Sequence, residues 1–148
     1  LLSLNLVGKK QIKLKDYWNK IPKSYLGLMI PKFPNLFIIQ GPGSPSVLTN
    51  VPVQIEQHVE WITNCLNFLN KKNKKTIEPT IRSAKKWSDE IKKLADASLF
   101  MKAKSSWYKG DNIPGKPKVF IPYPGGLPRY RNICNKVEKN QYKEFLIK

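Results

Sequence analysis

The amino-acid sequence predicts an α/β fold built on a strand, a glycine loop and a helix that follow one another directly. Residues 35–40 form a short apolar run between Pro34 and Gly41, which is typical of a strand buried on both faces, as in a parallel sheet. The next residues, 41–46, are all glycine, proline or serine, and they indicate a tight loop. From about Pro52 the apolar residues recur every three or four positions, which indicates a helix.

The first predicted helix has signals at both ends. Asn50 is a suitable N-cap, and Pro52 falls in the first turn, where its missing N–H leaves no helical bond unmade. The helix ends near the four lysines of residues 71–75, which we expect to form a solvated loop. Its apolar stripe, which we expect to face the core, consists of Ile55, Val59, Ile62, Leu66 and Leu69.

A second helix is predicted from a Thr80 cap to about Met101, after a break at residues 76–79. Its apolar stripe consists of Ile81, Ala84, Trp87, Ile91, Leu94, Ala95 and Leu99. An irregular stretch rich in glycine and proline follows at 105–118, and loops of that length are often functional. The other predicted elements are a strand-like piece around Val7 and Gly8, a short strand at 119–121, a helix at 129–139, and a docked terminus with Tyr142, Phe145 and Ile147.

The strong positive charge does not by itself indicate nucleic-acid binding. The formal net charge is +17, but only three of the 27 cationic residues are arginine, namely Arg82, Arg129 and Arg131. Surfaces that bind nucleic acid favour the planar guanidinium group, whereas lysine is typical of solvated faces. We therefore interpret the charge as exposed lysine and expect no nucleic-acid partner.

Other features of the composition narrow the function classes. The single histidine, His58, allows no site with a second imidazole, and Cys65 and Cys134 are too far apart for a CxxC motif. We therefore expect neither a zinc site nor a disulfide framework. No apolar run approaches the ~20 residues that a membrane span needs. The sequence begins with Leu1 and without a basic region that leads into a continuous apolar run, so we expect a cytoplasmic chain, not bound to a membrane, that continues upstream.

Spacing alone leaves two interpretations of the glycine loop open: an ordinary turn and a contact to a ligand. A glycine loop before a helix brings amides and the positive end of the helix dipole to one spot, where an anion binds readily. Gly41, Gly43 and Ser46 approach the spacing of a G-x-G-x-x-G dinucleotide motif. However, Pro42 and Pro45 remove two amide donors, so we do not predict a dinucleotide fingerprint here.

A set of short motifs extends in order over nearly the whole chain, from about Leu4 to Ile147. They are Phe33-Pro34-Asn35-Leu36-Phe37, Gly41-Pro42-Gly43-Ser44-Pro45-Ser46, Ile55-Glu56-Gln57-His58-Val59-Glu60-Trp61, Thr76-Ile77-Glu78-Pro79-Thr80, Ser106-Trp107-Tyr108, Pro114-Gly115-Lys116-Pro117, Gly125-Gly126 and Arg129-Tyr130-Arg131. Together these motifs resemble the Baeyer-Villiger monooxygenases of the cyclohexanone and phenylacetone type. Several motifs of unequal length in one order are highly specific.

The resemblance implies the C-terminal portion of a Rossmann-like FAD/NAD(P)-binding fold, with an irregular helical extension. Residues 1–75 would be the late segment of the FAD-binding domain, and residues 76–148 a helix, a mobile loop and a terminal segment. The implied enzyme uses FAD, NADPH and O2 to insert one oxygen atom next to a ketone carbonyl, which gives an ester or a lactone. Its flavin and NADPH fingerprints would lie upstream of Leu1, in a missing N-terminal part, so the chain alone is expected to be inactive.

The resemblance also assigns site residues within this chain. At the start of the first helix, the amides of the helix end can stabilise charge on the reduced flavin ring. No catalytic residue and no metal ligand is assigned in this segment, and the arginine that faces the flavin peroxide is expected upstream. The assigned contacts are Asn50, Val51 and Pro52 for FAD, Trp107 for NADP, and Leu48 and Phe120 for the substrate pocket.

Two alternatives come from other classes of function. If the chain were a complete protein, it would be a small basic module that stacks single-stranded nucleic acid on Trp107, Tyr108 and Tyr123. It would otherwise be a catalytically inactive fragment that packs against another subunit.

Overall fold

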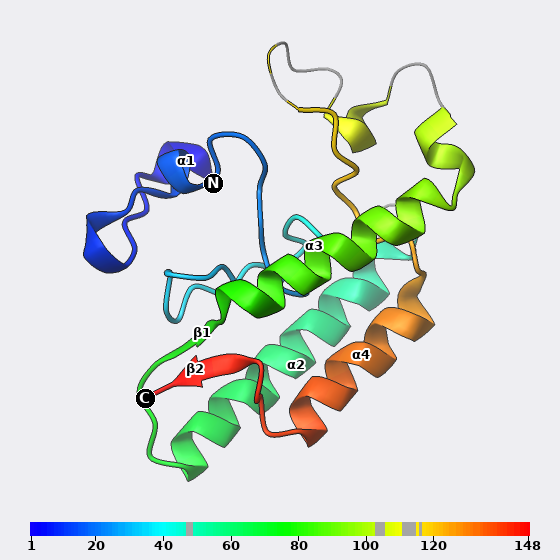
Figure 1. The fold of residues 1–148 in the computed structure, drawn as a ribbon. Coiled ribbons are helices and arrows are strands. Elements are labelled where there is room, and N and C mark those ends of the chain that lie inside the picture. The colour runs from blue at the N-terminus through cyan, green and yellow to red at the C-terminus, as the bar shows by residue number, and fades with distance from the viewer. Residues whose placement is uncertain (47–48, 103–105, 111–114, 116) are drawn as a thin grey trace.

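Three long helices form the body of the molecule in the computed structural model, which describes residues 1–46, 49–102, 106–110, 115 and 117–148. They are α2 (Val51–Lys71), α3 (Ile81–Asp96) and α4 (Leu127–Lys139). Figure 1 shows α2 and α4 side by side and running in the same direction, whereas α3 runs the opposite way.

The sheet of the described part of the chain has two strands. β1 (Ile77–Pro79) and β2 (Phe145–Ile147) pair antiparallel, with Ile77 opposite Ile147 and Pro79 opposite Phe145. The remaining elements are short: α1 (Leu14–Tyr17) and the 3-10 helices Leu2–Leu4, Lys9–Gln11, Leu99–Lys102 and Trp107–Lys109. The molecule therefore mixes helices and strands, but the described residues form no parallel sheet, and the Rossmann-like portion stays a prediction.

Both predicted helix caps are confirmed. The Asn50 side chain accepts a hydrogen bond from the Val53 amide at 3.4 Å, and the Thr80 hydroxyl accepts one from the Ser83 amide at 3.0 Å. Each bond satisfies an amide of the first turn that has no partner within its helix. These local signals explain why the starts of α2 and α3 could be predicted closely.

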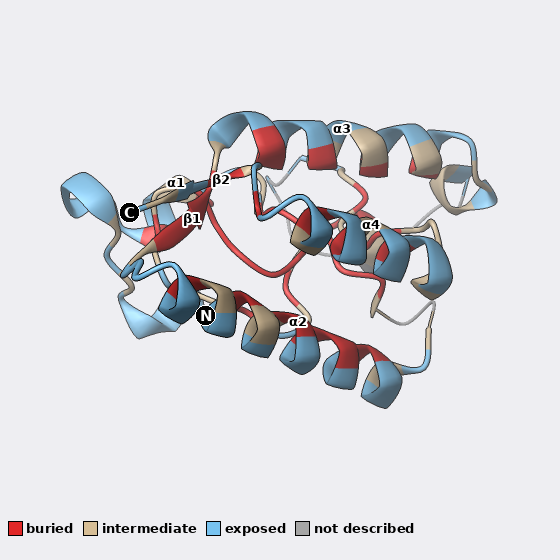
Figure 2. Cartoon of the chain, turned by 90° about the horizontal axis from the view of Figure 1, so that it is seen from below, coloured by how far each residue is buried: buried red, intermediate tan, exposed pale blue. Residues whose placement is uncertain are grey.

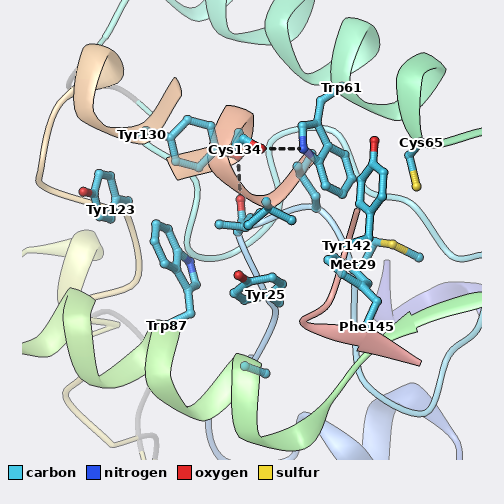
Figure 3. Packing of buried hydrophobic residues seen from close by; sticks show 14 of the residues in the cluster. Tyr25, Met29, Trp61, Cys65, Trp87, Tyr123, Tyr130, Cys134, Tyr142 and Phe145 are labelled. Carbon is cyan, nitrogen blue, oxygen red and sulfur yellow. Dashed lines mark hydrogen bonds between the residues drawn. The ribbon is translucent and has the colours of Figure 1, made fainter. Parts of the chain in front are cut away.

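The main core lies between the three helices and the segment 25–29 (Figure 3). Trp61 of α2 is 2% exposed, and its indole N–H donates to the Cys134 carbonyl of α4 at 3.2 Å. Tyr142 and Phe145 pack against the Trp61 ring, with centroids 5.4 and 6.0 Å away, which confirms that the C-terminal segment docks. This core draws on residues from both sides of residue 75, and the domain division at that residue stays a prediction.

The predicted apolar stripe of the first helix is wrong for most of its members. Ile55, Val59 and Leu66 are 37, 47 and 45% exposed, and only Leu69 of the five is buried. Figure 2 shows the buried face of α2 turned towards the other helices and an exposed face along its outer side. The face that this chain buries instead consists of Gln54, Gln57, His58, Trp61, Cys65 and Leu69.

The predicted strand at 35–40 is also wrong within this chain. Among the described residues, its only ladder contact is an isolated antiparallel bridge between Phe37 and Met29, and Ile39 is 46% exposed. A strand buried on both faces needs neighbouring strands, and the described residues supply none for this segment. The N-terminal piece likewise forms only an isolated bridge, between Val7 and Lys13.

The second half departs from prediction in smaller ways. The second helix ends at Asp96 rather than near Met101, and a 3-10 turn, Leu99–Lys102, follows it. Residues 119–121 are hydrogen-bonded but form no strand, and the last helix begins at Leu127 rather than at residue 129. The lysine-rich residues 71–75 are all exposed, as expected of a solvated loop.

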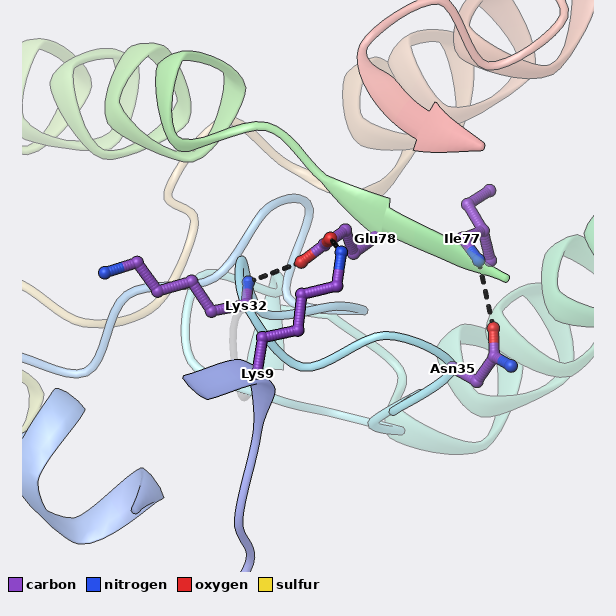
Figure 4. A network of polar contacts seen from close by, with 5 residues as sticks. All are labelled: Lys9, Lys32, Asn35, Ile77 and Glu78. Atoms are coloured by element: carbon purple, nitrogen blue, oxygen red, sulfur yellow. Dashed lines mark hydrogen bonds and ion pairs between the residues drawn. The ribbon is translucent and has the colours of Figure 1, made fainter. Parts of the chain in front are cut away.

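A polar cluster fastens the N-terminal region to β1 (Figure 4). Glu78 is 4% exposed, and its carboxylate accepts the Lys9 ammonium and, at 2.8 Å, the Lys32 amide. The Asn35 side chain accepts the Ile77 amide at 3.0 Å, while the Asn35 amide donates back to the Ile77 carbonyl at 2.9 Å. These bonds hold the segment before the glycine loop in place.

Candidate functional site

Three amides of the glycine loop donate to carbonyl groups within the protein. Gly41 donates to the Gly27 carbonyl at 3.1 Å, Gly43 to the Ile121 carbonyl at 3.0 Å, and Ser44 to the Gly41 carbonyl at 3.1 Å. A phosphate site needs several free amides directed at one point. These internal bonds favour the interpretation of the loop as a structural turn over that of a dinucleotide site.

Close packing explains why glycine occupies two positions of this loop. A Cβ atom on Gly41 would lie 2.5 Å from the Gly27 carbonyl oxygen. Gly43 has a φ of 90°, in the left-handed region, and a Cβ atom there would lie 2.9 Å from the indole nitrogen of Trp87. That nitrogen donates to the Gly43 carbonyl at 3.0 Å, so the loop rests directly on α3.

The extended residues 119–123 connect the loop to the segment that follows Trp107. Ile121 donates its amide to the Tyr108 carbonyl at 2.8 Å and accepts the Gly43 amide at its own carbonyl. The Tyr123 amide donates to the Ser44 carbonyl at 2.8 Å. Three segments that are distant in sequence thus share one backbone hydrogen-bond network.

A cavity of about 220 Å³ lies beside this network. Its lining is mainly apolar, and Phe120, a predicted substrate-pocket residue, is part of it together with Trp87, Ile91 and Met101. The Phe120 ring is 5% exposed and packs on Tyr108, with ring centroids 5.9 Å apart. A small, mainly apolar cavity of this kind suits a small uncharged ligand.

The start of α2 offers a different chemical setting from that of the loop. Asn50 and Pro52 are exposed and Val51 is partly buried. Pro52 has no amide hydrogen and the Val53 amide is held by the Asn50 cap, so Val51 carries the one first-turn amide here for which the described residues offer no acceptor. A single amide suits the edge of a ring system better than a charged diphosphate, which several amides would bind.

The structure also contains a buried polar network that the sequence did not predict. The His58 ring is fully buried, and its Nδ1 atom accepts the Gln40 amide at 3.2 Å. Since Nδ1 accepts, the neutral ring carries its proton on Nε2, which lies 2.9 Å from the Tyr130 hydroxyl. The Tyr130 hydroxyl in turn donates to the Leu26 carbonyl at 2.6 Å.

Burial sets the protonation state of this network. Desolvation lowers the pKa of His58 from 6.5 to about 4, because the buried ring is expensive to charge. The network links α2 and α4 to Leu26 and Gln40, and His58 has a structural role in it. No short sequence motif could have indicated it, because His58 and Tyr130 are 72 residues apart.

The remaining predicted site residues are placed only in part. Leu48 lies outside the described residues, and Trp107 begins the 3-10 helix Trp107–Lys109. Phe120 lines the cavity and packs against Tyr108, the residue after Trp107, whereas Asn50, Val51 and Pro52 lie at the N-terminus of α2. In the described part of the chain, no helix is long and apolar enough to cross a membrane, and no group of three or more His, Cys, Asp and Glu residues is arranged to hold a metal ion.

Comparison with known proteins gives several similar sequences. The chain is 36% identical over 142 residues to the cyclohexanone 1,2-monooxygenase of an Acinetobacter species, a match that covers 96% of this chain. It is 35% identical over 145 residues to a Baeyer-Villiger monooxygenase of Pseudooceanicola batsensis, covering 98% of this chain. Each match spans 26% of the relative, so the chain corresponds to about a quarter of their length. No family model matches the chain.

Solved structures give the same result. The cyclohexanone monooxygenase of Rhodococcus sp. Phi1, bound to NADP+, superposes with a TM-score of 0.91 at 35% identity, covering 97% of this chain and 27% of that one. An oxidised steroid monooxygenase bound to NADP superposes with a TM-score of 0.87 at 38% identity, covering 97% of this chain and 26% of that one. The fold described above is therefore also found as one part of considerably longer proteins.

Proposed function

We propose that this chain forms part of a Baeyer-Villiger monooxygenase, because nearly its whole length is homologous to about one quarter of the length of such enzymes. The observation that carries the proposal is the agreement of sequence and fold: relatives at 35–36% identity are named for this activity, and a neighbour named for it superposes with a TM-score of 0.91. In this proposal, FAD and NADPH are the cofactors, O2 is the oxidant, and a ketone is the substrate.

The start of α2 is the part of this chain that fits FAD. Asn50, Val51 and Pro52 would hold the edge of the flavin ring, with the Val51 amide and the helix dipole favouring negative charge on it. When bound, the flavin supplies the redox chemistry that activates O2. The glycine loop contributes indirectly, since its bonds to Ile121 and Trp87 fix the chain that leads into α2.

The cavity beside Phe120 is the part that fits a small apolar substrate. Phe120 would line the substrate pocket together with Leu48, and Trp107 would contact NADP. The hydrogen bond from Ile121 to the Tyr108 carbonyl supports a joint role, because it ties the wall of the cavity to the residue that follows Trp107. Closure of that segment would exclude water from the reaction.

Domain grafting tests the proposed function. The 148-residue chain replaces the matching quarter of the Acinetobacter cyclohexanone monooxygenase, and FAD content, NADPH oxidation and lactone formation are measured. We expect the graft to bind FAD and to form lactone, and we expect the chain alone to bind no FAD tightly. Tight stoichiometric FAD binding by the chain alone, or a graft that folds without FAD, would contradict the proposal.

Replacing Trp107 by alanine in the graft tests the NADP contact. We expect FAD to stay bound and NADPH oxidation to continue in part, because the change removes only a contact that holds the segment closed. The amount of product formed per NADPH consumed should fall roughly five- to tenfold. This corresponds to a loss of about 1–1.4 kcal/mol in the free energy that favours the closed segment. Tyr108→Phe is the control, since it changes the neighbouring residue and keeps its ring. An unchanged ratio together with an unchanged apparent NADPH affinity would show that Trp107 only packs.

The relatives lend no support to a module that binds single-stranded nucleic acid, because they are monooxygenases. We further propose that the enzyme acts in the cytoplasm, needs neither nucleic acid nor a membrane, and has the N-terminal remainder of the enzyme as its partner.

A further inference from the structure

An exposed row of aliphatic side chains runs along one side of α2. We call Ile55, Val59, Ile62 and Leu66 the α2 stripe. Ile55, Val59 and Leu66 are 37, 47 and 45% exposed, and Ile62 is partly buried. Their spacing of four, three and four residues places all four side chains on one face of the helix.

The stripe borders the buried face of α2 directly. Each of its members follows a buried or partly buried residue by one position in the chain, which corresponds to a rotation of about 100° around the helix. The apolar arc of α2 is therefore wider than the surface that this chain covers. The residues that immediately precede the stripe residues are Gln54, His58, Trp61 and Cys65.

Another exposed aliphatic residue, Ile39, lies outside α2 but close to it in the hydrogen-bond network. Ile39 is 46% exposed, and it precedes Gln40, whose amide donates to the His58 ring and whose side chain donates to the Val51 carbonyl of α2. Its apolar segment has the sequence pattern of a strand buried on both faces. Both α2 and the neighbouring segment 35–40 thus have apolar side chains that the described part of this chain leaves exposed.

The size of the patch favours one kind of occupant. A stripe of this kind amounts to on the order of a few hundred Å², whereas stable association of separate proteins buries ~800 Å² on each partner. A segment of the same polypeptide can dock on a smaller surface, because the covalent link gives it a high effective concentration. The relatives provide such a segment, since the matched region is only 26% of their length.

We propose that the α2 stripe, with Ile39, is the surface on which the remainder of the monooxygenase polypeptide packs. This inference rests on the proposed function. It assigns the uncovered face of α2 to a contact within one enzyme and not to a second copy of this chain. In the assembled enzyme the contact would hold the N-terminus of α2, and with it Val51, against the rest of the FAD site.

Site-specific thiol labelling tests the proposal. Ile55→Cys and Leu66→Cys are prepared in the chain alone and in the graft described above, with Asn67→Cys, at an exposed position off the stripe, as the matched control. The native thiols give a low background, because Cys65 and Cys134 are 0% exposed and burial raises the pKa of both to about 12. The probe is a fluorescent maleimide, and the labelling rate is measured under native conditions.

In the chain alone, the two stripe cysteines should react about as fast as the Asn67→Cys control. In the graft they should react at least about tenfold more slowly, while the control keeps its rate. Equal slowing at the control position, or stripe cysteines that stay reactive in a graft that binds FAD and forms lactone, would overturn this inference alone. Protection in the chain alone that grows with its concentration would assign the stripe to a second copy and overturn it too. A folded graft without FAD would overturn the proposed function as well.

Discussion

Replacing Trp87 by alanine is expected to lower the free energy of unfolding by about 3–5 kcal/mol. Trp87 is 5% exposed, its ring stacks on Tyr123 with centroids 4.7 Å apart, and its indole N–H donates to the Gly43 carbonyl. The change removes the largest side chain of α3 from the core and leaves the Gly43 carbonyl without its donor. Urea unfolding followed by circular dichroism gives the difference directly.

A second variant separates packing from the hydrogen bond, and a third serves as a control. Trp87→Phe keeps a ring in the core but loses the N–H donor, so we expect a smaller loss than for alanine. Leu99→Ala is the control at an exposed position, since Leu99 is 77% exposed, and it should change stability by no more than about 0.5 kcal/mol. A loss of less than about 1 kcal/mol for Trp87→Ala would show that the glycine loop does not depend on α3.

Acidification should destabilise the chain through His58. The pKa of His58 is lowered to about 4 by burial, whereas in the unfolded chain it returns to about 6.5. Between these values the unfolded state binds a proton that the folded state does not. The contribution of His58 is therefore fully present above pH ~6.5 and falls by about 3 kcal/mol in total as the pH drops to about 4.

His58→Gln isolates this effect. Glutamine does not titrate, yet it can both accept and donate a hydrogen bond in the space of the imidazole. His58 is the only histidine of the chain, so the unfolding free energy of the variant should depend less on pH between about 6.5 and 5.5. Measurement of urea midpoints across this range for both proteins is sufficient. Identical pH profiles would show that the ring is not held neutral by burial.

Local signals predicted the helices well, whereas the direction in which one of them faces could not be predicted. Asn50 and Thr80 act on amides three residues away, so the sequence contains all the information for their caps. The buried face of α2 instead includes the polar residues Gln54 and His58, whose side chains are satisfied by Thr49, five residues away, and by Tyr130, 72 residues away. Hydropathy alone favours the neighbouring aliphatic stripe, which this chain leaves exposed.

Strands were the least predictable elements, because each depends on a partner elsewhere. β1 has only three residues, one of which is Pro79, so its sequence carries no strand signal of its own. Its partner strand lies near the C-terminus, at Phe145–Ile147. The run at 35–40 carries the signal but forms only an isolated bridge with the described residues. Of the candidate site, the start of α2 follows from local pattern, and the assignment of Trp107 and Phe120 came from the motif resemblance.

The hydrogen bond from the Tyr130 hydroxyl to the Leu26 carbonyl joins residues 104 positions apart, and the bond from Trp61 to Cys134 joins residues 73 apart. Contacts between such distant positions form only after the entropy of a long loop has been lost. Contacts over such long stretches of sequence slow folding, because they form later than local contacts. We therefore expect the central aromatic core to form late, with the apolar faces of α2 and α3 open to water and to other chains until α4 packs against them.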